Sequence, residues 1–126
     1  TMTGEVTEVV PPSDLMLCPN GVGVDANGQL LIGAFFNGYV LRYQDGEFEV
    51  VAENMRGADA VEQGRDGSIY VSSWNQGKIW EINTEGDIAV VAEGFASAAD
   101  FYLDDRNGML YLPDMLAGKV YRILLP

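Results

Sequence analysis

The strongest constraint on this sequence is a pattern that recurs three times at intervals of about 40 residues. In each copy a glycine turn, an alternating apolar segment, a second glycine turn and a second alternating segment follow one another. The glycines of the two turns form two tracks: Gly28, Gly67 and Gly108, and Gly38, Gly77 and Gly118. Because both tracks are spaced by 39 and then 41 residues, the pattern indicates an internal structural repeat.

Each repeat is expected to form four antiparallel strands joined by tight turns. The first turn of each repeat is Asn-Gly or Asp-Gly, which supplies the positive φ angles that short hairpins require. Segments such as 39–43 and 78–82 alternate in hydropathy with the period of a half-buried strand. Four antiparallel strands in about 40 residues are typical of one propeller blade. We therefore predict an all-β fold, a β-propeller with three four-stranded blades per chain, which is half of a six-bladed propeller.

The blades divide residues 1–126 into a single half-propeller domain, with units at about 19–57, 58–97 and 98–126. The third unit contains three strand-like segments, whereas residues 4–10 resemble the fourth strands of the first two units. We expect this N-terminal strand to complete a third blade across a homodimer, in which two chains form six blades with two-fold symmetry. The alternative is that the chain is a fragment of a longer protein.

The charge balance and the missing residue types exclude several functions. Seven Lys and Arg oppose nineteen Asp and Glu, a net charge of −12, and such a surface repels nucleic-acid phosphates and anionic membranes. Histidine is absent and Cys18 is the single cysteine, which excludes histidine-based catalysis and cysteine-rich zinc sites. Catalysis must then use carboxylates, amides, hydroxyls or a metal held by oxygen. No signal-peptide pattern is visible, so we expect a cytoplasmic protein.

One mouth of the predicted propeller collects polar and aromatic side chains. The innermost strands are expected to begin at Asn20, Asp59 and Asp100, so these side chains should gather around the axis. The second strands end at the same mouth and supply the predicted substrate-binding residues, which are Phe35, Phe36, Asn37, Trp74, Asn75, Asp114 and Met115. A polar floor with an aromatic rim is typical of a pocket for a small molecule.

Converging carboxylates repel one another unless they are protonated or bridged by a cation. Oxygen ligands favour a divalent cation, with calcium first, then magnesium or manganese, and zinc the least suited. A bound cation polarises a carbonyl and lowers the pKa of its water, so an ester or lactone can be hydrolysed without histidine. Asn20, Asp59 and Asp100 are the predicted metal ligands, and Asp59 or Asp100 is the predicted catalytic base. The alternative is that these side chains only cap backbone groups where the strands begin.

Segments 19–30 and 66–71 resemble the gluconolactonase and regucalcin (senescence marker protein) group of six-bladed propellers, and are also similar to strictosidine synthase-like and NHL-repeat propellers. The resemblance implies a metal-dependent hydrolase of a small lactone or ester with its site in the central channel. The metal-binding Asn and Asp of that group match Asn20 and Asp59, whereas its Glu has no counterpart at these positions. A dimer would bring two copies of the candidate ligands into one channel. The alternative function is a non-catalytic propeller that binds a small molecule or serves as a scaffold for a protein partner.

Overall fold

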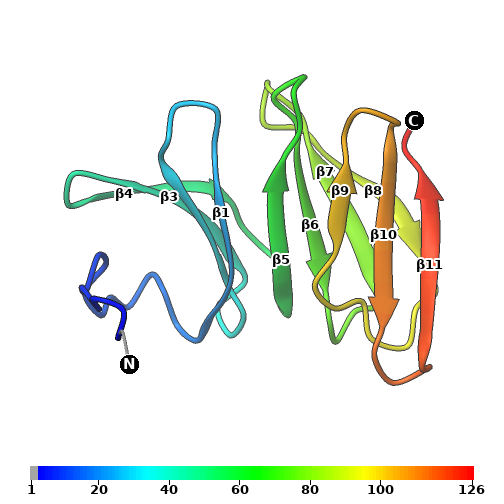
Figure 1. Ribbon diagram of the computed structural model, residues 1–126, viewed down its shortest axis with the longest axis horizontal. Helices are drawn as coiled ribbons and strands as arrows, with labels where there is room; N and C mark the ends of the chain where they lie inside the picture. Colours follow the sequence, from blue (N-terminus) through cyan, green and yellow to red (C-terminus); the bar gives the residue numbers. More distant parts are fainter. Residues whose placement is uncertain (1–2) are drawn as a thin grey trace.

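In the computed structural model, which describes residues 3–126, the strands form three antiparallel sheets placed side by side (Figure 1). The first sheet contains β1 (Pro19–Val24), β2 (Leu30–Ala34), β3 (Tyr39–Gln44) and β4 (Glu47–Ala52). The second sheet contains β5 (Ala58–Gln63), β6 (Ile69–Ser73), β7 (Lys78–Ile82) and β8 (Ile88–Glu93). The third sheet contains β9 (Tyr102–Asp104), β10 (Met109–Asp114) and β11 (Lys119–Leu124).

Each sheet is a meander in which strands that are consecutive in the sequence pair side by side. The glycines of the first hairpins have φ angles of 79°, 89° and 61° at Gly28, Gly67 and Gly108, the left-handed region that glycine enters at low cost. The predicted strands and turns of the repeat are therefore confirmed. Among residues 3–126 there is no helix of the length and hydropathy needed to cross a membrane.

The N-terminal segment does not form the predicted strand within the single chain. Residues 4–10 have no regular structure and are mostly exposed, with Val6 at 96% exposure. Closer to β1, the backbone N–H of Phe35 donates to the Cys18 carbonyl at 2.9 Å, which attaches the chain just before β1 to the β2–β3 turn of the first sheet. The third sheet accordingly has three strands in the single chain, and its completion by a second chain stays a prediction.

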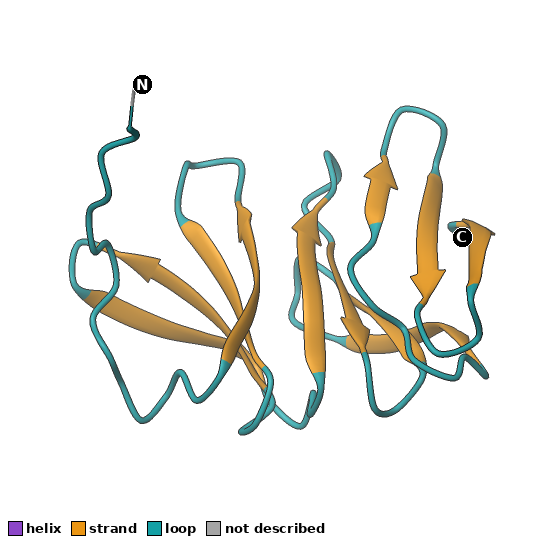
Figure 2. Cartoon of the chain, turned by 60° about the horizontal axis from the view of Figure 1, so that its bottom comes forward, coloured by secondary structure: helices purple, strands orange, loops and turns teal. Residues whose placement is uncertain are grey.

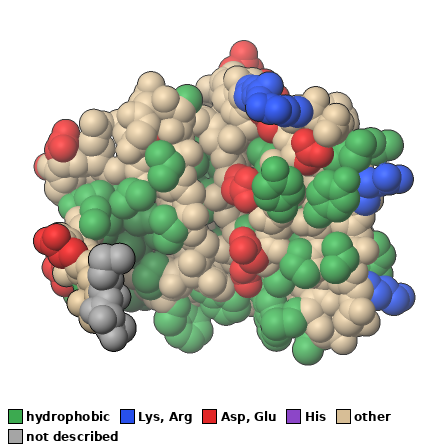
Figure 3. Space-filling view, in the orientation of Figure 1, with side chains coloured by type: hydrophobic (Ala, Val, Ile, Leu, Met, Phe, Trp, Pro, Cys, Tyr) green, Lys and Arg blue, Asp and Glu red, His purple; other side chains and the backbone are tan. Residues whose placement is uncertain are grey.

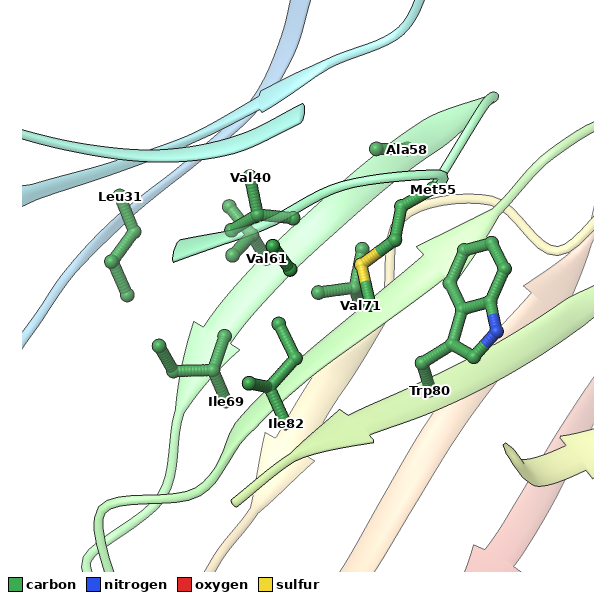
Figure 4. Packing of buried hydrophobic residues seen from close by; sticks show 10 residues of the cluster. Leu31, Val40, Met55, Ala58, Val61, Ile69, Val71, Trp80 and Ile82 are labelled. Carbon is green, nitrogen blue, oxygen red and sulfur yellow. The ribbon is translucent and has the colours of Figure 1, made fainter. Parts of the chain in front are cut away.

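The three sheets follow one another along the molecule in Figure 2, and two apolar clusters fill the spaces between neighbouring sheets. The cluster between the first and second sheets, drawn in Figure 4, contains Leu31, Val40, Ala52, Met55, Ala58, Val61, Ile69, Val71, Trp80 and Ile82. The cluster between the second and third sheets contains Ala60, Tyr70, Ile79, Ala98, Phe101, Leu103, Leu110 and Leu112. Burial of apolar area between sheets, at roughly 25 cal/mol per Å², is thus the main force that holds the three sheets together.

The innermost strands of the first two sheets approach each other more closely than side chains would permit. A Cβ atom added at Gly21 would overlap the carbonyl oxygen of Asp59, and one added at Gly23 would overlap that of Val61. Both glycines lie on β1, and both carbonyls lie on β5. The absence of a side chain at these two positions lets the strands converge, and this convergence brings the beginnings of β1 and β5 together.

Candidate functional site

The first two candidate ligands lie at equivalent places on neighbouring innermost strands. Pro19 pairs with Ala34 and Ala58 pairs with Ser73, so Asn20 and Asp59 follow corresponding ladder positions. The Asn20 side chain lies close enough to the Asp59 carboxylate to lower its pKa. Acidic side chains also gather near the centre of the face shown in Figure 3, with apolar side chains around them. The structure therefore brings Asn20 and Asp59 together, as the sequence predicted.

The carboxyl group of Asp59 has a raised pKa. Its half-buried position raises the pKa of the carboxyl group, because removal from water disfavours the charged form. The negative charge of Asp100 raises the pKa further, while the Asn20 side chain partly opposes the shift. Asp100 therefore lies close enough to act on Asp59, and the two carboxylates repel each other across the beginnings of the strands.

The structure corrects the predicted position of Asp100 within the repeat. The isolated bridge from Ala98 to Asp114 is the counterpart of the Ala58–Ser73 pair, so Ala99 rather than Asp100 corresponds to Asp59. Asp100 is one residue further along the chain and is exposed. The physical reason is that the third unit has one more residue between its first and second strands, so spacing counted from the glycine turn misplaces the first strand by one.

Glu62 is a carboxylate near this site that the sequence analysis missed. It lies on β5 and is half-buried, and its carboxyl group lies near the backbone of Leu103 on β9. Burial raises the pKa of Glu62, the Leu103 backbone lowers it, and the negative charge of Asp100 raises it. The available signal was an acidic residue within an innermost strand, three positions after Asp59. Asp100 thus couples to two carboxylates of the same strand.

Four of the predicted substrate-binding residues remain accessible at the mouth. Phe36 and Met115 are 66% and 61% exposed, and Phe35 and Trp74 are half-buried. The rings of Phe35 and Phe36 meet edge to face, with centroids 6.4 Å apart. A fifth, Asn75, is exposed, and its Oδ1 atom lies 3.2 Å from Ser73 Oγ. These residues follow the second strands of the three sheets, and their role in substrate binding stays a prediction.

The two other predicted pocket residues, Asn37 and Asp114, have structural roles instead. Asp114 is 2% exposed, and the backbone N–H groups of Ala96 and Ser97 donate to its carboxylate at 2.8 and 2.9 Å. Burial alone would raise the pKa of Asp114, but these hydrogen bonds hold it below its usual value. The side-chain amide of Asn37 donates to the Leu15 carbonyl at 2.8 Å and so anchors the N-terminal segment. Loop backbone therefore binds the carboxylate of Asp114 and the side-chain N–H group of Asn37, whereas the Oδ1 atom of Asn37 is buried without a hydrogen-bond partner among the described residues.

The oxygen atoms at the mouth are of the chemical type that a hard cation binds, but one chain supplies too few of them. Amide and carboxylate oxygens are the ligands that calcium prefers, and calcium takes six to eight of them. Across residues 3–126, however, no three side chains of His, Cys, Asp or Glu converge in a way that could hold a metal ion. One chain therefore offers a partial ligand set in Asn20 and Asp59, with Asp100 nearby.

The raised pKa of Asp59 leads to a prediction about stability. A folded-state pKa above the unfolded value means that the protonated acid favours folding, fully below pH 3.8, and that this contribution is lost as the pH rises through the folded-state pKa. We expect Asp59→Asn, which mimics the neutral acid, to raise the melting temperature at pH 7 by roughly 2 °C. The difference should vanish near pH 3, whereas exposed Asp14→Asn should change little at either pH. A melting temperature at pH 7 that falls in Asp59→Asn would contradict this electrostatic account.

No family model and no curated protein sequence matches this chain. Solved structures do match it. A gluconolactonase from Xanthomonas campestris superposes with a TM-score of 0.70 and 15% identity, over 88% of this chain and 39% of its own. A calcium-binding regucalcin from Agrobacterium tumefaciens gives a TM-score of 0.67 and 16% identity, over 85% of this chain and 45% of its own. A streptogramin B lyase gives 0.62 and 15% identity, over 86% of this chain and 41% of its own.

These likenesses establish the architecture. The fold is that of a partial β-propeller. The half-propeller spans less than half the length of each of these three proteins. The proteins that share its fold include a lactonase, a calcium-binding protein and a lyase, so the fold by itself does not select one reaction. The function of the half-propeller must be argued from its own side chains.

Proposed function

We propose that the half-propeller binds a divalent cation, calcium first, at the mouth formed by Asn20, Asp59 and Asp100 and that it hydrolyses a small lactone or ester there. The observation that carries this proposal is the concentration of negative charge on a half-buried carboxylate, Asp59, beside Asp100. Repulsion between two carboxylates lowers the stability of the folded protein, and carboxylates with shifted pKa values are common at functional sites. The gluconolactonase and the calcium-binding regucalcin that share the fold support the same choice.

In this proposal Asn20, Asp59 and Asp100 have different roles in binding the cation and in catalysis. The side-chain carbonyl oxygen of Asn20, which lies near the Asp59 carboxylate, would serve as a ligand. A bound cation would neutralise the repulsion between the carboxylates and polarise the substrate carbonyl. Asp100, which is exposed, takes a proton from the water whose oxygen attacks the carbonyl carbon. The carbon–oxygen bond of the lactone then breaks, and the proton passes to the leaving oxygen to give a hydroxy acid.

The rim of the mouth accounts for the size of the substrate. Phe36 and Met115 present exposed apolar surface, while the half-buried Phe35 and Trp74 have less freedom to move. Aromatic and thioether side chains of this kind pack against the apolar faces of small ligands. A small, uncharged lactone ring suits this rim better than an anionic polymer, because the chain carries a net charge of −12.

Calorimetric titration with calcium chloride tests the cation site. We expect wild-type protein to bind calcium saturably, and Asp59→Asn to weaken the affinity at least about tenfold, or 1.4 kcal/mol. Asp14→Asn, at an exposed aspartate outside the mouth, is the matched control and should bind as wild type does. Equal calcium affinity in wild type and Asp59→Asn would remove Asp59 from the proposed site.

Turnover separates hydrolysis from simple binding. Wild-type protein with calcium should open a gluconolactone-type substrate, and a chelator or Asp100→Asn should abolish the rate above background. The second candidate function, a non-catalytic binding module, is favoured by the partial ligand set of one chain. Saturable binding of calcium or of the lactone without any turnover would establish that second function and overturn the hydrolase.

A further inference from the structure

The third sheet presents an apolar surface on the side away from the second sheet. We name this surface the open face and define it by Tyr102, Met109, Tyr111, Pro113, Val120 and Leu124, which share one side of the β9–β10–β11 ladder with the charged residues Asp104 and Arg122. Val120 and Leu124 are each 72% exposed and Tyr102 is 67% exposed. Apolar side chains are visible over the third sheet in Figure 3. A contiguous surface of this kind marks an interaction site.

The internal repeat shows what covers such a surface. Tyr111 pairs with Arg122 as Leu31 pairs with Arg42 and Tyr70 with Glu81, so the first members of these pairs are equivalent. Leu31 is 0% exposed and Tyr70 is 5% exposed, whereas Tyr111 is 36% exposed. At a second position Val40 and Ile79 are both 0% exposed, whereas their equivalent Val120 is 72% exposed. In the first two sheets this surface is covered by the next sheet, so the open face is a sheet-to-sheet interface without its second half.

Part of the matching half is exposed at the other end of the same chain, although Ile32 and Leu41, the equivalents of Val71 and Trp80, are buried there. Val22 on β1 pairs with Ile32 as Val61 on β5 pairs with Val71. Val61 is 1% exposed because it packs against the preceding sheet, whereas Val22 is 63% exposed. The first sheet therefore displays part of the surface that the second sheet uses to receive its neighbour. One chain carries both halves of a contact that it already makes twice internally.

The free edge of β11 repeats a charge pattern from the third strands of the other sheets. On β3, Arg42 forms an ion pair of 2.9 Å with Glu49 of β4. On β7, Lys78 pairs in register with Glu93 of β8. β11 carries the equivalent cations Arg122 and Lys119, and neither forms an ion pair within the part of the chain that the structure describes.

Residues 4–10 carry the charges that would match this edge. A regular antiparallel register, without the bulge that the equivalent ladders of the first two sheets contain, places Glu5 opposite Arg122 and Glu8 opposite Lys119. The same register places Val6 opposite Tyr121. The equivalent pairs of the first two sheets are Leu41 with Val50 and Trp80 with Val90. This register satisfies the charge pattern and the apolar pattern together, as does the register that places Glu8 opposite Arg122 and Val9 opposite Tyr121.

We propose that the open face and the β11 edge bind a second copy of this chain, through its first sheet and its residues 4–10. The same chain cannot satisfy its own edge in this arrangement, because residues 4–10 lie beside the first sheet and β11 lies at the opposite end (Figure 1). Two-fold symmetry supplies the contact twice and leaves neither apolar surface open, so the product is a closed ring of six sheets. The inference rests on the repeat and stands whether or not the mouth binds a cation.

Native mass spectrometry and light scattering test the pairing. Wild-type protein at about 50 µM should have twice the 13.7 kDa mass of the chain. Val120→Glu should raise the dimer dissociation constant at least about a hundredfold, because it places a charge in the apolar contact. Val90→Glu, the same change at a 48% exposed position of β8, is the matched control and should remain dimeric. A folded wild-type monomer, a larger open oligomer, or an unaffected Val120→Glu dimer would overturn the proposal.

A charge swap tests the strand register. Glu5→Arg alone and Arg122→Glu alone should each weaken the dimer by roughly tenfold, because each places like charges opposite one another in both copies of the contact. The double variant Glu5→Arg/Arg122→Glu should recover most of the wild-type affinity. Backbone amides of β11 should also exchange more slowly in the dimer than in monomeric Val120→Glu. Additive losses in the double variant would overturn this register, and equal exchange of β11 in both states would overturn the pairing with residues 4–10.

Discussion

Replacing Gly21 by alanine is expected to destabilise the half-propeller by about 3 kcal/mol or more. The added Cβ would overlap the carbonyl oxygen of Asp59. That oxygen belongs to the backbone of a neighbouring strand, so it cannot move aside as the end of a flexible side chain can. The first and second sheets would have to separate along β1 and β5, and the apolar cluster between them would lose contacts. Urea denaturation followed by circular dichroism measures the effect.

Gly4→Ala is the matched control, because nothing lies within 4 Å of a Cβ built at Gly4. Its free energy of unfolding should stay within about 0.5 kcal/mol of wild type. If Gly21→Ala unfolds at the same urea concentration as wild type, the close approach of β1 and β5 does not exist in solution. The convergence that brings Asn20 to Asp59 would then be lost as well.

Leu112→Ala should cost about 2–5 kcal/mol of unfolding free energy. Leu112 is 0% exposed and belongs to the cluster that joins the second and third sheets. Removing its isobutyl group leaves a cavity that flanking sheets cannot fill without moving the strands, and the lost apolar contacts add to this cost. Thermal denaturation and urea titration both report the change.

Leu116→Ala serves as the control for this cavity, since Leu116 is 66% exposed in the β10–β11 turn. It should change the unfolding free energy by no more than about 0.5 kcal/mol. A loss in Leu112→Ala that is as small as in Leu116→Ala would show that the third sheet does not pack stably on the second. The mouth would then lose the contribution of Asp100.

The strands and hairpins were predictable because their causes are local. Alternation along a strand and a glycine at a positive φ act within a few residues, and the repeat made each signal visible three times. The register of the third unit was not predictable from the same signals. The glycine turns position the second and third strands, but the first strand is positioned by pairing, so Asp100 was assigned to the place that Ala99 holds.

The candidate site was predictable only in part, for a similar reason. Asn20 and Asp59 come together because two strands begin at equivalent places, and the repeat exposed that equivalence. Asp114 and Asn37 were assigned to the pocket from strand direction alone. Their hydrogen-bond partners lie 17–18 and 22–23 residues away in the sequence, and no local pattern encodes such contacts. Glu62 was missed because its partner, Leu103, lies on the neighbouring sheet.

The sequence by itself determined that this chain is all-β, that it consists of three repeated units, and that histidine chemistry is absent from it. These properties follow from composition and short-range periodicity, which need no knowledge of distant contacts. Only the tertiary structure decided which carboxylates repel one another, which polar side chains form hydrogen bonds with loop backbone, and which repeat positions are exposed to solvent. Those outcomes depend on how the sheets pack, because burial and charge separation are properties of residues that meet across sheets.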